Sequence, residues 1–463
     1  MAEKTFEEVQ THLITSGFVY PGSEIYGGLS NSWDYGPLGT LLKNHLKDLW
    51  LKHFVRGIEY NVQIDPAIIR NPKVWVATGH VANFHDPLVD CKYCHSRYRA
   101  DQIIHEQKPD LDVDGRSQDE LNKIRQSGEI KCPNCGKNEF TPIRQFQRRF
   151  KTFIGVTEDK QSEVYLRPET AQGIFVNFKN VRRTTRRKLP IGICDIGKSF
   201  RNEITPGNFT FRTREFEQRE IEFFFKPGED DKWFNFYKEN CKAFVEKLGL
   251  KDEKVRFRDH EPQELAFYSK ATTDIEYDFP TLGWGELRGI ACRGDYDLGR
   301  HRKASTQDLT YLDPETNQRY IPHVVEPSFG LDRLRLALLR DSYEVEELEG
   351  GKDSRIVRHL ARSLAPYTFA VRPLSNKLIA PAKELFDSLR YDFDCLFDTT
   401  GSIGKRYRRE DAIGTPLCIT YDFDSVNDHA VTVRERDSRK QERVPVASLK
   451  QYIRNFLDQE NVR

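Results

Sequence analysis

The alternation of hydrophobic and polar positions predicts a long antiparallel hairpin near the middle of the chain. Apolar residues dominate 191–204, a polar turn follows, and alternation returns over 214–225. Because strand side chains alternate between two faces, Arg201 and Glu203 are expected to project together from the first strand. One face of the second strand is expected to hold Phe216, Gln218 and Glu220. The hairpin is therefore predicted to gather guanidinium groups beside carboxylates, which suits a phosphate-bearing ligand, and a solvated surface is the alternative.

Helical and strand periodicities place further elements on both sides of this hairpin. Apolar residues at helical spacing predict an opening helix within 6–20 and a second helix that ends near Val55. Strand patterns return at 272–277 and 282–298, where several glycines permit close backbone approach. The stretch 321–339 has the pattern of a strand, a glycine break and an amphipathic helix.

The last hundred residues have a pattern of their own. From Leu364 onward, short apolar runs alternate with helical segments, which predicts a small α/β domain. Within it, 401–416 combines basic and aromatic residues suited to phosphate contact and base stacking, although Glu410 and Asp411 add opposite charge. We expect 405–409 to contact nucleic acid, and a solvated charged face is the alternative.

Composition narrows the class of protein. The chain of 463 residues is long enough for two or three domains with substantial cores. Its 72 basic side chains nearly balance 71 acidic ones, so any nucleic-acid surface must be a local basic patch. No apolar run is long enough to span a bilayer and no leader pattern opens the chain, so a soluble, cytoplasmic protein is expected. Methionine occurs only as Met1, although this residue normally fills irregular gaps in large cores.

The nine cysteines predict a metal site rather than a disulfide framework. Their number is odd, and four of them form two Cys-x-x-Cys pairs, which are Cys91, Cys94, Cys132 and Cys135. Four thiolates complete the tetrahedral shell of zinc and leave no position for a substrate. We therefore predict a structural zinc ion, with free thiols as the alternative.

Several segments resemble motifs of one enzyme family. Phe-Arg-Asn-Glu at 200–203 and Phe-Arg-Thr-Arg-Glu-Phe at 211–216 resemble motif 2 of the class II aminoacyl-tRNA synthetases, and Glu-Pro-Ser-Phe-Gly-Leu-Asp-Arg at 326–333 resembles motif 3. Thr-Pro-Gly-Asn-Phe at 205–209 and Arg-Pro-Glu-Thr-Ala-Gln-Gly at 167–173 resemble the glycyl-tRNA synthetases in particular. The resemblance covers nearly the whole chain and is specific to the homodimeric type.

This resemblance implies an α+β fold, in which an antiparallel class II sheet with flanking helices carries a cysteine-rich zinc insert and a C-terminal α/β anticodon-binding domain. The first part of the catalytic domain is expected over 1–88 and the zinc insert over 89–150. The second part, with motifs 2 and 3, is expected over 151–363 and the anticodon-binding domain over 364–463. One segment, 144–150, departs from the more apolar pattern expected there.

The implied activity is that of a glycine–tRNA ligase. Such an enzyme activates glycine with ATP and Mg²⁺, releases pyrophosphate, and transfers glycine to the 3′ end of tRNA(Gly). The segment that leads into the second predicted helix is similar to the region before motif 1, which implies a homodimer. A catalytically inactive synthetase-like protein that binds RNA or has a regulatory role is the alternative, and a class II ligase for another amino acid is a second one. Joint retention of Arg201, Glu203, Glu286 and Arg333 argues against the inactive protein.

The resemblance also implies roles for individual residues. Arg201 is expected to contact the ATP α-phosphate, Glu286 to hold magnesium, and Arg333 to meet the γ-phosphate; these three are the expected catalytic residues. Residues expected to bind glycine are Arg99, Glu169, Phe216, Glu217, Gln218, Arg219, Glu220, Glu326, Pro327, Ser328, Phe329 and Gly330. Residues expected to bind ATP are Arg201, Asn202, Glu203, Phe211, Arg212, Thr213, Arg214, Glu215, Phe216, Glu286, Leu287, Gly330, Leu331, Asp332 and Arg333.

Overall fold

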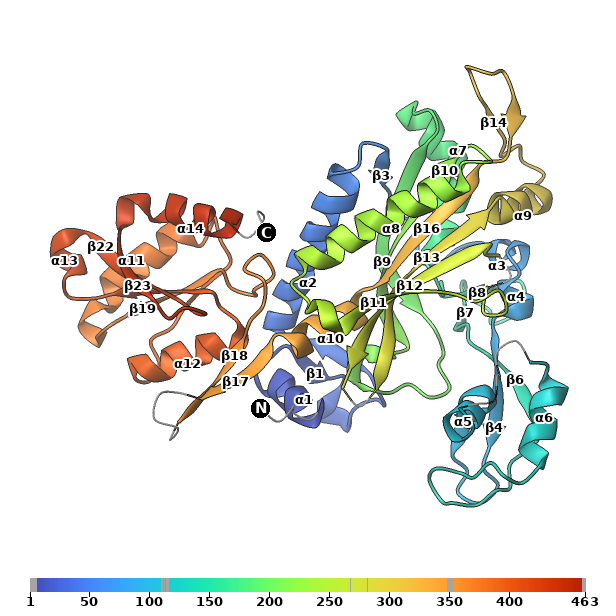
Figure 1. Cartoon of the computed structure of the whole chain (residues 1–463), viewed down its shortest axis with the longest axis horizontal. Coiled ribbons are helices and arrows are strands. Elements are labelled where there is room, and N and C mark those ends of the chain that lie inside the picture. Colours follow the sequence, from blue (N-terminus) through green and yellow to red (C-terminus); the bar gives the residue numbers. More distant parts are fainter. Residues whose placement is uncertain are drawn as a thin grey trace.

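The computed structural model describes residues 6–109, 111, 113, 116–266, 268–280, 282–347 and 353–459. A large central body holds the longest sheet, a small insert projects from one end of it, and the C-terminal part lies at the opposite end (Figure 1). Among the described residues, no helix is both long and apolar enough to cross a membrane.

The central body is built on a seven-stranded sheet. Its strands, in spatial order, are β11 (Val255–Asp259), β12 (Ala271–Phe279), β13 (Gly283–Gly294), β16 (His323–Gly330), β10 (Glu215–Phe225), β9 (Ile191–Phe200) and β3 (Asn61–Gln63). Neighbouring strands are antiparallel except for β3 and β9, which are parallel. The predicted antiparallel sheet is therefore confirmed.

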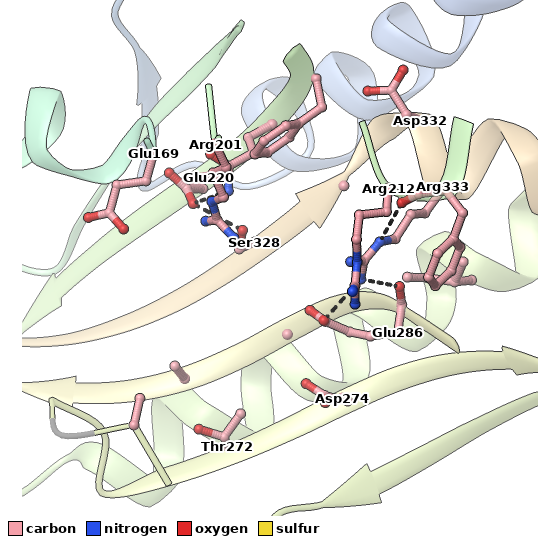
Figure 2. Close-up of a pocket in the computed structure, with 18 of the residues that line it drawn as sticks. Glu169, Arg201, Arg212, Glu220, Thr272, Asp274, Glu286, Ser328, Asp332 and Arg333 are labelled. Carbon is pink, nitrogen blue, oxygen red and sulfur yellow. Dashed lines mark hydrogen bonds and ion pairs between the residues drawn. The ribbon is translucent and has the colours of Figure 1, made fainter. Parts of the chain in front are cut away.

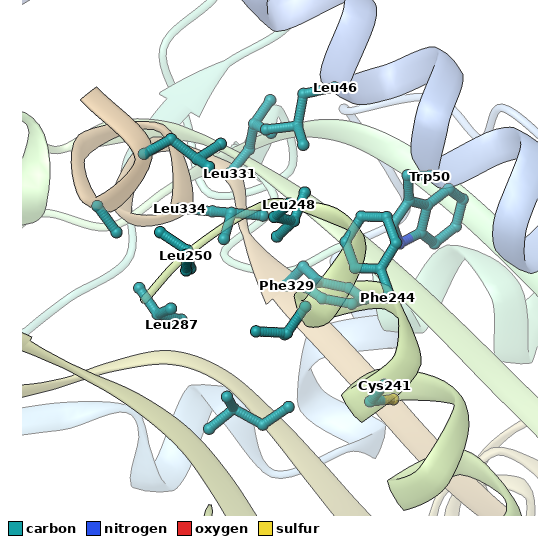
Figure 3. Packing of buried hydrophobic residues seen from close by; sticks show 14 of the residues in the cluster. Leu46, Trp50, Cys241, Phe244, Leu248, Leu250, Leu287, Phe329, Leu331 and Leu334 are labelled. Carbon is teal, nitrogen blue, oxygen red and sulfur yellow. The ribbon is translucent and has the colours of Figure 1, made fainter. Parts of the chain in front are cut away.

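Helices cover both faces of this sheet. One face packs against α1 (Phe6–Thr15), α2 (Pro37–Trp50), α8 (Asp230–Lys247) and α10 (Leu331–Asp341), and the other packs against α7 (Ala171–Thr185) and α9 (Tyr296–Ser305). The helical spacing of Leu42, Leu46 and Trp50 buries one side of α2, as expected from the sequence. Figure 3 shows Trp50 beside Phe244 of α8 and Phe329 of β16 in this core.

Alternation along β10 divides its side chains between a core face and a polar face. Ile221, Phe223 and Phe225 join the cluster beneath α2 and α8. The intervening positions, Glu220 and Glu222, point to the opposite face. The polar face predicted for the hairpin therefore exists, and it lies inside the molecule rather than in water.

Two strand boundaries differ from the sequence prediction. The first hairpin strand ends at Phe200 instead of continuing to 204, because the backbone N–H of Asn202 donates to the carbonyl of Arg148 in a distant segment. Arg201 and Glu203 therefore lie beyond the strand. Strand β13 ends at Gly294, and α9 begins two residues later, where a continuing strand was expected.

Shorter elements surround the main sheet. The insert contains β4 (His85–Asp90), β5 (Arg97–Arg99), α5 (Ala100–Gln107), α6 (Gln118–Gln126) and β6 (Arg144–Gln147). Its three strands pair antiparallel, and its helices close over a separate small core. Other short elements are β1 (Val19–Pro21), β2 (Trp33–Tyr35), α3 (Lys73–Ala77), α4 (His80–Asn83), β7 (Lys151–Phe153), β8 (Glu163–Tyr165), β14 (Tyr311–Leu312), β15 (Arg319–Tyr320), β17 (Tyr343–Glu347) and β18 (Ser354–Arg358).

The C-terminal part has a five-stranded mixed sheet and its own hydrophobic core, which confirms the predicted small α/β fold. Its strands, in spatial order, are β20 (Cys395–Phe397), β19 (Phe369–Pro373), β21 (Leu417–Tyr421), β22 (Ala430–Glu435) and β23 (Gln441–Pro445). Its helices are α11 (Ile379–Leu389), α12 (Ile403–Ile413), α13 (Ser425–Asp428) and α14 (Leu449–Asp458).

Candidate active site

A polar pocket of about 360 Å³ lies on the inner polar face of the seven-stranded sheet. Strands β10, β12, β13 and β16 supply much of its lining, together with residues that follow β8, β9 and β11. In Figure 2, Glu169, Glu220 and Ser328 lie in one half of the pocket, and Glu286 and Arg333 lie in the other half. Arginine and glutamate side chains make up most of the labelled wall, so the pocket offers charges of both signs to a ligand.

Four buried glutamates gather at the first half of the pocket; Glu169, Glu220 and Glu326 line it, and Glu222 lies beside them without lining it. Carboxylate oxygens of Glu220, Glu222 and Glu326 lie within 4.8 Å of one another. Glu220 and Ser328 are cross-strand partners, and the Ser328 hydroxyl donates to Glu220 Oε1 over 3.1 Å. Glu169 enters from the segment before α7, where Gln172 Nε2 donates to its Oε1 over 2.9 Å. Such a concentration of buried carboxylates attracts a compact cation.

The four glutamates differ in their electrostatic surroundings. Burial opposes ionisation of Glu169, yet the charge and contact of His80, whose Nε2 lies 3.2 Å from Oε2, hold the Glu169 pKa below its usual range. Burial raises the pKa of Glu220, and the charge of Glu169 adds to the rise. Burial also raises the pKa of Glu326 to about 8 and that of Glu222 well above its usual range. Burial and crowding therefore disfavour the charged form of Glu220, Glu222 and Glu326.

One arginine partly neutralises this cluster. The Arg293 guanidinium donates to Glu326 and, over 2.8 and 3.0 Å, to the two oxygens of Asp297. Asp297 in turn accepts a 2.9 Å bond from Gln172, so the pocket wall is a connected network. Within the described chain, neither Glu222 oxygen has a hydrogen-bond partner. The cluster therefore retains capacity for a ligand that donates several hydrogen bonds.

Arg201 is one of the residues that line the pocket. Its Nε donates to the carbonyl of Pro168 over 3.0 Å, and its guanidinium stacks 5.3 Å from the Phe216 ring centroid and 5.6 Å from that of Phe84. Among the described residues, no carboxylate forms an ion pair with Arg201, in contrast to the buried Arg293. Its charge is thus oriented and available to an anion.

The second half of the pocket pairs Arg333 with Glu286. Arg333 Nη1 lies 3.1 Å from Glu286 Oε2, and its guanidinium stacks 4.6 Å from the Phe211 ring centroid. Asp274 faces Glu286 from the neighbouring strand, and burial together with the charge of Glu286 raises the Asp274 pKa to about 6. Two carboxylates at this edge provide oxygen donors of the kind that Mg²⁺ prefers.

The insert also reaches the pocket. Arg99 lines it from the end of β5 and forms ion pairs with Asp101 and Asp86. Arg148, just beyond β6, forms an ion pair with Glu203. Small changes in the insert would therefore move charged groups at the pocket mouth.

The structure brings together most of the residues predicted for the site. The pocket is lined by Arg99, Glu169, Arg201, Glu203, Phe211, Arg212, Thr213, Phe216, Gln218, Glu220, Glu286, Leu287, Glu326, Ser328, Gly330, Asp332 and Arg333. Other predicted residues do not line it: Asn202, Arg214, Glu215, Glu217, Arg219, Pro327, Phe329 and Leu331. Phe329 and Leu331 lie in the core beneath the sheet, because strand alternation and the start of α10 turn them away from the pocket.

Sequence reasoning missed several residues of the carboxylate network. Glu222 follows Glu220 by two positions on the same strand, so its alternation was a visible signal. Arg293, Asp297 and His80 had no such signal, since their contacts with Glu326, Gln172 and Glu169 join segments that are distant in the sequence.

The four paired cysteines converge at the far side of the insert. Sγ of Cys91 lies 3.6 Å from Sγ of Cys135, and Sγ of Cys94 lies 3.5 Å from Sγ of Cys132. All four sulfurs lie within 4.8 Å of one another. A tetrahedral zinc with Zn–S bonds of about 2.3 Å needs sulfur separations of about 3.8 Å. The donor set therefore fits zinc in both number and spacing.

An antiparallel sheet with motif 2 on adjacent strands and motif 3 on a strand and its following helix defines the class II aminoacyl-tRNA synthetases. A family model described as the tRNA synthetase class II core domain (G, H, P, S and T) matches residues 150–343, and one described as an anticodon binding domain matches 368–456. The chain is 58% identical over 441 residues to a glycine–tRNA ligase of Bacillus cereus, which covers 94% of this chain and 96% of the relative.

Two further relatives have the same name. A glycine–tRNA ligase of Clostridium kluyveri is 57% identical over 460 residues, and one of Clostridium perfringens is 56% identical over 464 residues; each match covers 98% of this chain and 99% of the relative. The chain belongs to the glycine–tRNA ligase family of class II aminoacyl-tRNA synthetases.

Proposed function

We propose that this protein activates glycine with ATP, releases pyrophosphate, and transfers the glycyl group to the 3′ end of tRNA(Gly). The observation that carries this proposal is the buried carboxylate cluster beside an oriented arginine in a small pocket. An amino acid has an ammonium and a carboxylate only a few bonds apart, and the two halves of the pocket match that arrangement. Amino-acid-dependent ATP–pyrophosphate exchange tests the first step.

The ammonium of glycine would bind among the glutamates. Glu169 is held ionised, and Glu220 is aligned by Ser328, so both carboxylates are positioned to accept hydrogen bonds from a compact cation. Glu326 and Arg293 close the pocket behind them. A substrate side chain would have to enter this closed charged network, so glycine, which has none, is favoured sterically and electrostatically.

ATP would occupy the other half of the pocket. Arg201 would meet the α-phosphate, where negative charge develops as the glycine carboxylate attacks, and Arg333 would meet the γ-phosphate. Glu286 and Asp274 are the carboxylates that would hold magnesium, which when bound neutralises phosphate charge. Binding of ATP would exchange the Glu286 partner of Arg333 for a phosphate.

The chain's residues act by orientation and charge, and no covalent enzyme intermediate is required. The glycine carboxylate oxygen bonds to the α-phosphorus, and the bond to pyrophosphate breaks. The terminal ribose hydroxyl of the tRNA then attacks the glycyl carbonyl, and AMP departs with the phosphate oxygen. Holding the reactants in line within one pocket supplies much of the acceleration.

Cys91, Cys94, Cys132 and Cys135 would hold a structural zinc ion, which when bound links the two ends of the insert. Two of these cysteines are buried in the small core of the insert, so loss of the metal would leave unpaired thiolates there.

We expect one zinc ion per chain in purified protein, and loss of that zinc in Cys94→Ser, because three thiolates do not complete the tetrahedral shell. The insert of this variant should be cleaved rapidly by proteases, since a small domain that depends on metal unfolds without it. Elemental analysis and limited proteolysis measure both effects. Cys395→Ser, outside the insert, should keep its zinc; metal-free protein with an intact insert would favour free thiols.

The remaining expectations concern assembly and tRNA. We propose the domain limits 1–88, 89–150, 151–363 and 364–463, a cytoplasmic location, and a homodimer. Exposed apolar side chains before α2 support the dimer, with Ile25 at 87% and Tyr26 at 86% exposure. The C-terminal part would bind the tRNA anticodon.

The basic stretch 405–409 divides into two kinds of side chain. Arg406 is buried and donates to the carbonyls of Gly401, Pro373 and Asp398, so it supports the fold. The expectation that all four basic residues contact nucleic acid is therefore wrong for Arg406. The exposed basic residues of α12 are Lys405, Arg408 and Arg409.

We expect the triple variant Lys405→Ala, Arg408→Ala, Arg409→Ala to weaken tRNA binding and leave glycine-dependent pyrophosphate exchange unchanged. Each lost phosphate contact should reduce the salt slope of binding by about one. Charging assays at several salt concentrations measure this effect through the KM for tRNA. Lys450→Ala with Arg454→Ala on α14 is the matched control, and normal charging by the triple variant would place the tRNA elsewhere.

A further inference from the structure

Among the described residues, the largest fully buried side chains include those of Arg167, Arg219, Arg288, Arg358 and Arg372. Arg167 shows what a buried guanidinium requires. Its Nε donates to the Lys198 carbonyl over 2.7 Å, and its Nη1 donates to the Pro66 carbonyl over 3.0 Å and to Asp195 over 3.2 Å. Burial of a charged group is stable when hydrogen bonds and an opposite charge replace water in this way.

Arg288 lacks all of these partners. In the part of the chain that the structure describes, none of its three guanidinium nitrogens has a hydrogen-bond partner. The guanidinium carbon lies 3.4 Å from the Phe329 ring centroid and 5.6 Å from that of Phe54, inside the core that Figure 3 shows around Trp50 and Phe329. Burial lowers the pKa of Arg288 to about 10. The surroundings of this side chain are those of an apolar residue.

The same mismatch recurs at other positions. Arg219 faces α2 and donates only through Nη1 to the Leu46 carbonyl; among the described residues Nε and Nη2 have no hydrogen-bond partner, and Nη2 lies 3.9 Å from a carboxylate oxygen of Glu217. Arg372, in the separate core of the C-terminal part, contacts only the Cys418 sulfur as a hydrogen-bond acceptor, and Nε and Nη1 have none in the described chain. On α10, the buried Arg335 pairs with Asp332 through Nη2, while its Nε and Nη1 lack hydrogen-bond partners there. Two independent cores thus contain arginine where the packing suits an apolar side chain.

Methionine shows the complementary anomaly. It is absent from every position after Met1, although 30 phenylalanines show that large apolar side chains are plentiful. Methionine is unbranched and flexible, and it fills the irregular gaps that large cores contain. The aliphatic part of the arginine side chain is also unbranched. An arginine at a position that suits methionine can therefore occupy the same space in the core.

We propose that the cell from which this gene comes translates one arginine codon as methionine, so that the native protein carries methionine at positions 219, 288, 335 and 372. This assignment explains both anomalies. If the gene encodes its internal methionines with the reassigned codon, translation by the standard code shows no methionine after Met1 and shows arginine at positions where methionine packs. A bound anion does not explain them, because Arg219, Arg288 and Arg372 are at most 1% exposed and Arg288 is surrounded by aromatic rings.

The gene sequence provides the first test. We expect positions 219, 288, 335 and 372 to share one codon, which the well-partnered Arg167, Arg293 and Arg355 do not use. AGG is the expected codon, because it differs from the methionine codon ATG at one base. Mixed codons at the four positions, or the same codon at the partnered arginines, would overturn the proposal. In protein isolated from its own cells, trypsin should fail to cleave after the four positions, and peptide masses should correspond to methionine.

Stability of the full chain made in a host with the standard code provides the second test. Arg288→Met and Arg372→Met should each raise the midpoint of thermal unfolding by several degrees, because an unpaired buried guanidinium is replaced by an apolar side chain of similar course. Arg434→Met is the matched control. Its guanidinium is buried and donates to both oxygens of Asp411 over 2.8 and 3.1 Å, so its loss should lower the midpoint. A lower midpoint in Arg288→Met would contradict the proposal.

Discussion

Arg201→Ala is expected to reduce glycine-dependent ATP–pyrophosphate exchange about 10²- to 10³-fold, the range typical for removal of one group that stabilises developing charge. The reason is positional: the Pro168 carbonyl and the Phe216 ring hold the guanidinium in place, and no described carboxylate neutralises it. The loss should appear in kcat more than in the KM for glycine, because charge at the α-phosphate develops in the transition state.

Lys198→Ala is the matched control for this variant. Lys198 lies three residues earlier on the same hairpin, is half exposed, and pairs with Glu215 outside the pocket. Its removal should leave exchange within about twofold of the original rate, since exposed ion pairs contribute little. Near-normal exchange by Arg201→Ala, with its fold intact, would contradict the assigned phosphate role.

Glu220→Gln is expected to raise the KM for glycine about 10- to 100-fold. A hydrogen bond to a charged group contributes about 1.5–3 kcal/mol, and each 1.36 kcal/mol corresponds to a factor of ten. Glutamine keeps the size of the side chain and can still accept from Ser328 through its amide oxygen, so the change removes the charge and the acceptor that faces Thr170. Steady-state exchange at varied glycine concentration measures it.

A control variant and the KM for ATP show whether the effect of Glu220→Gln is specific to glycine binding. Glu246→Gln changes an exposed glutamate on α8, outside the pocket, and should leave the KM for glycine unchanged. The KM for ATP should stay nearly constant in Glu220→Gln, because the ATP half of the pocket is formed by other residues. An unchanged KM for glycine in Glu220→Gln would place the ammonium elsewhere.

Periodicity was sufficient for the elements on which the pocket rests. Alternation over 214–225 predicted the polar face that holds Gln218 and Glu220, and the glycine break at 330 predicted the junction of β16 and α10. These patterns are local consequences of strand and helix geometry, so they are readable without any tertiary contact.

Contacts between segments that are distant in the sequence could not be predicted from periodicity. The early end of β9 depends on a bond between Asn202 and Arg148, and the assignment of Arg406 to the fold depends on carbonyls at the end of β19 and in the loop before α12. The pairing of Arg293 with Glu326 follows from a register in which Ala291 opposes Glu326, and no sequence periodicity specifies that register. Tertiary contacts therefore determine the end of β9, the structural role of Arg406 and the Arg293–Glu326 pair.

Selection of glycine by the carboxylate pocket can be measured by ATP–pyrophosphate exchange with each common amino acid in turn. We expect exchange that depends on glycine, with alanine and serine reduced to background, because any side chain would have to enter the pocket among Glu169, Glu220 and Glu326. Exchange supported equally by alanine or serine would contradict the account, and so would its absence with every amino acid in well-folded protein.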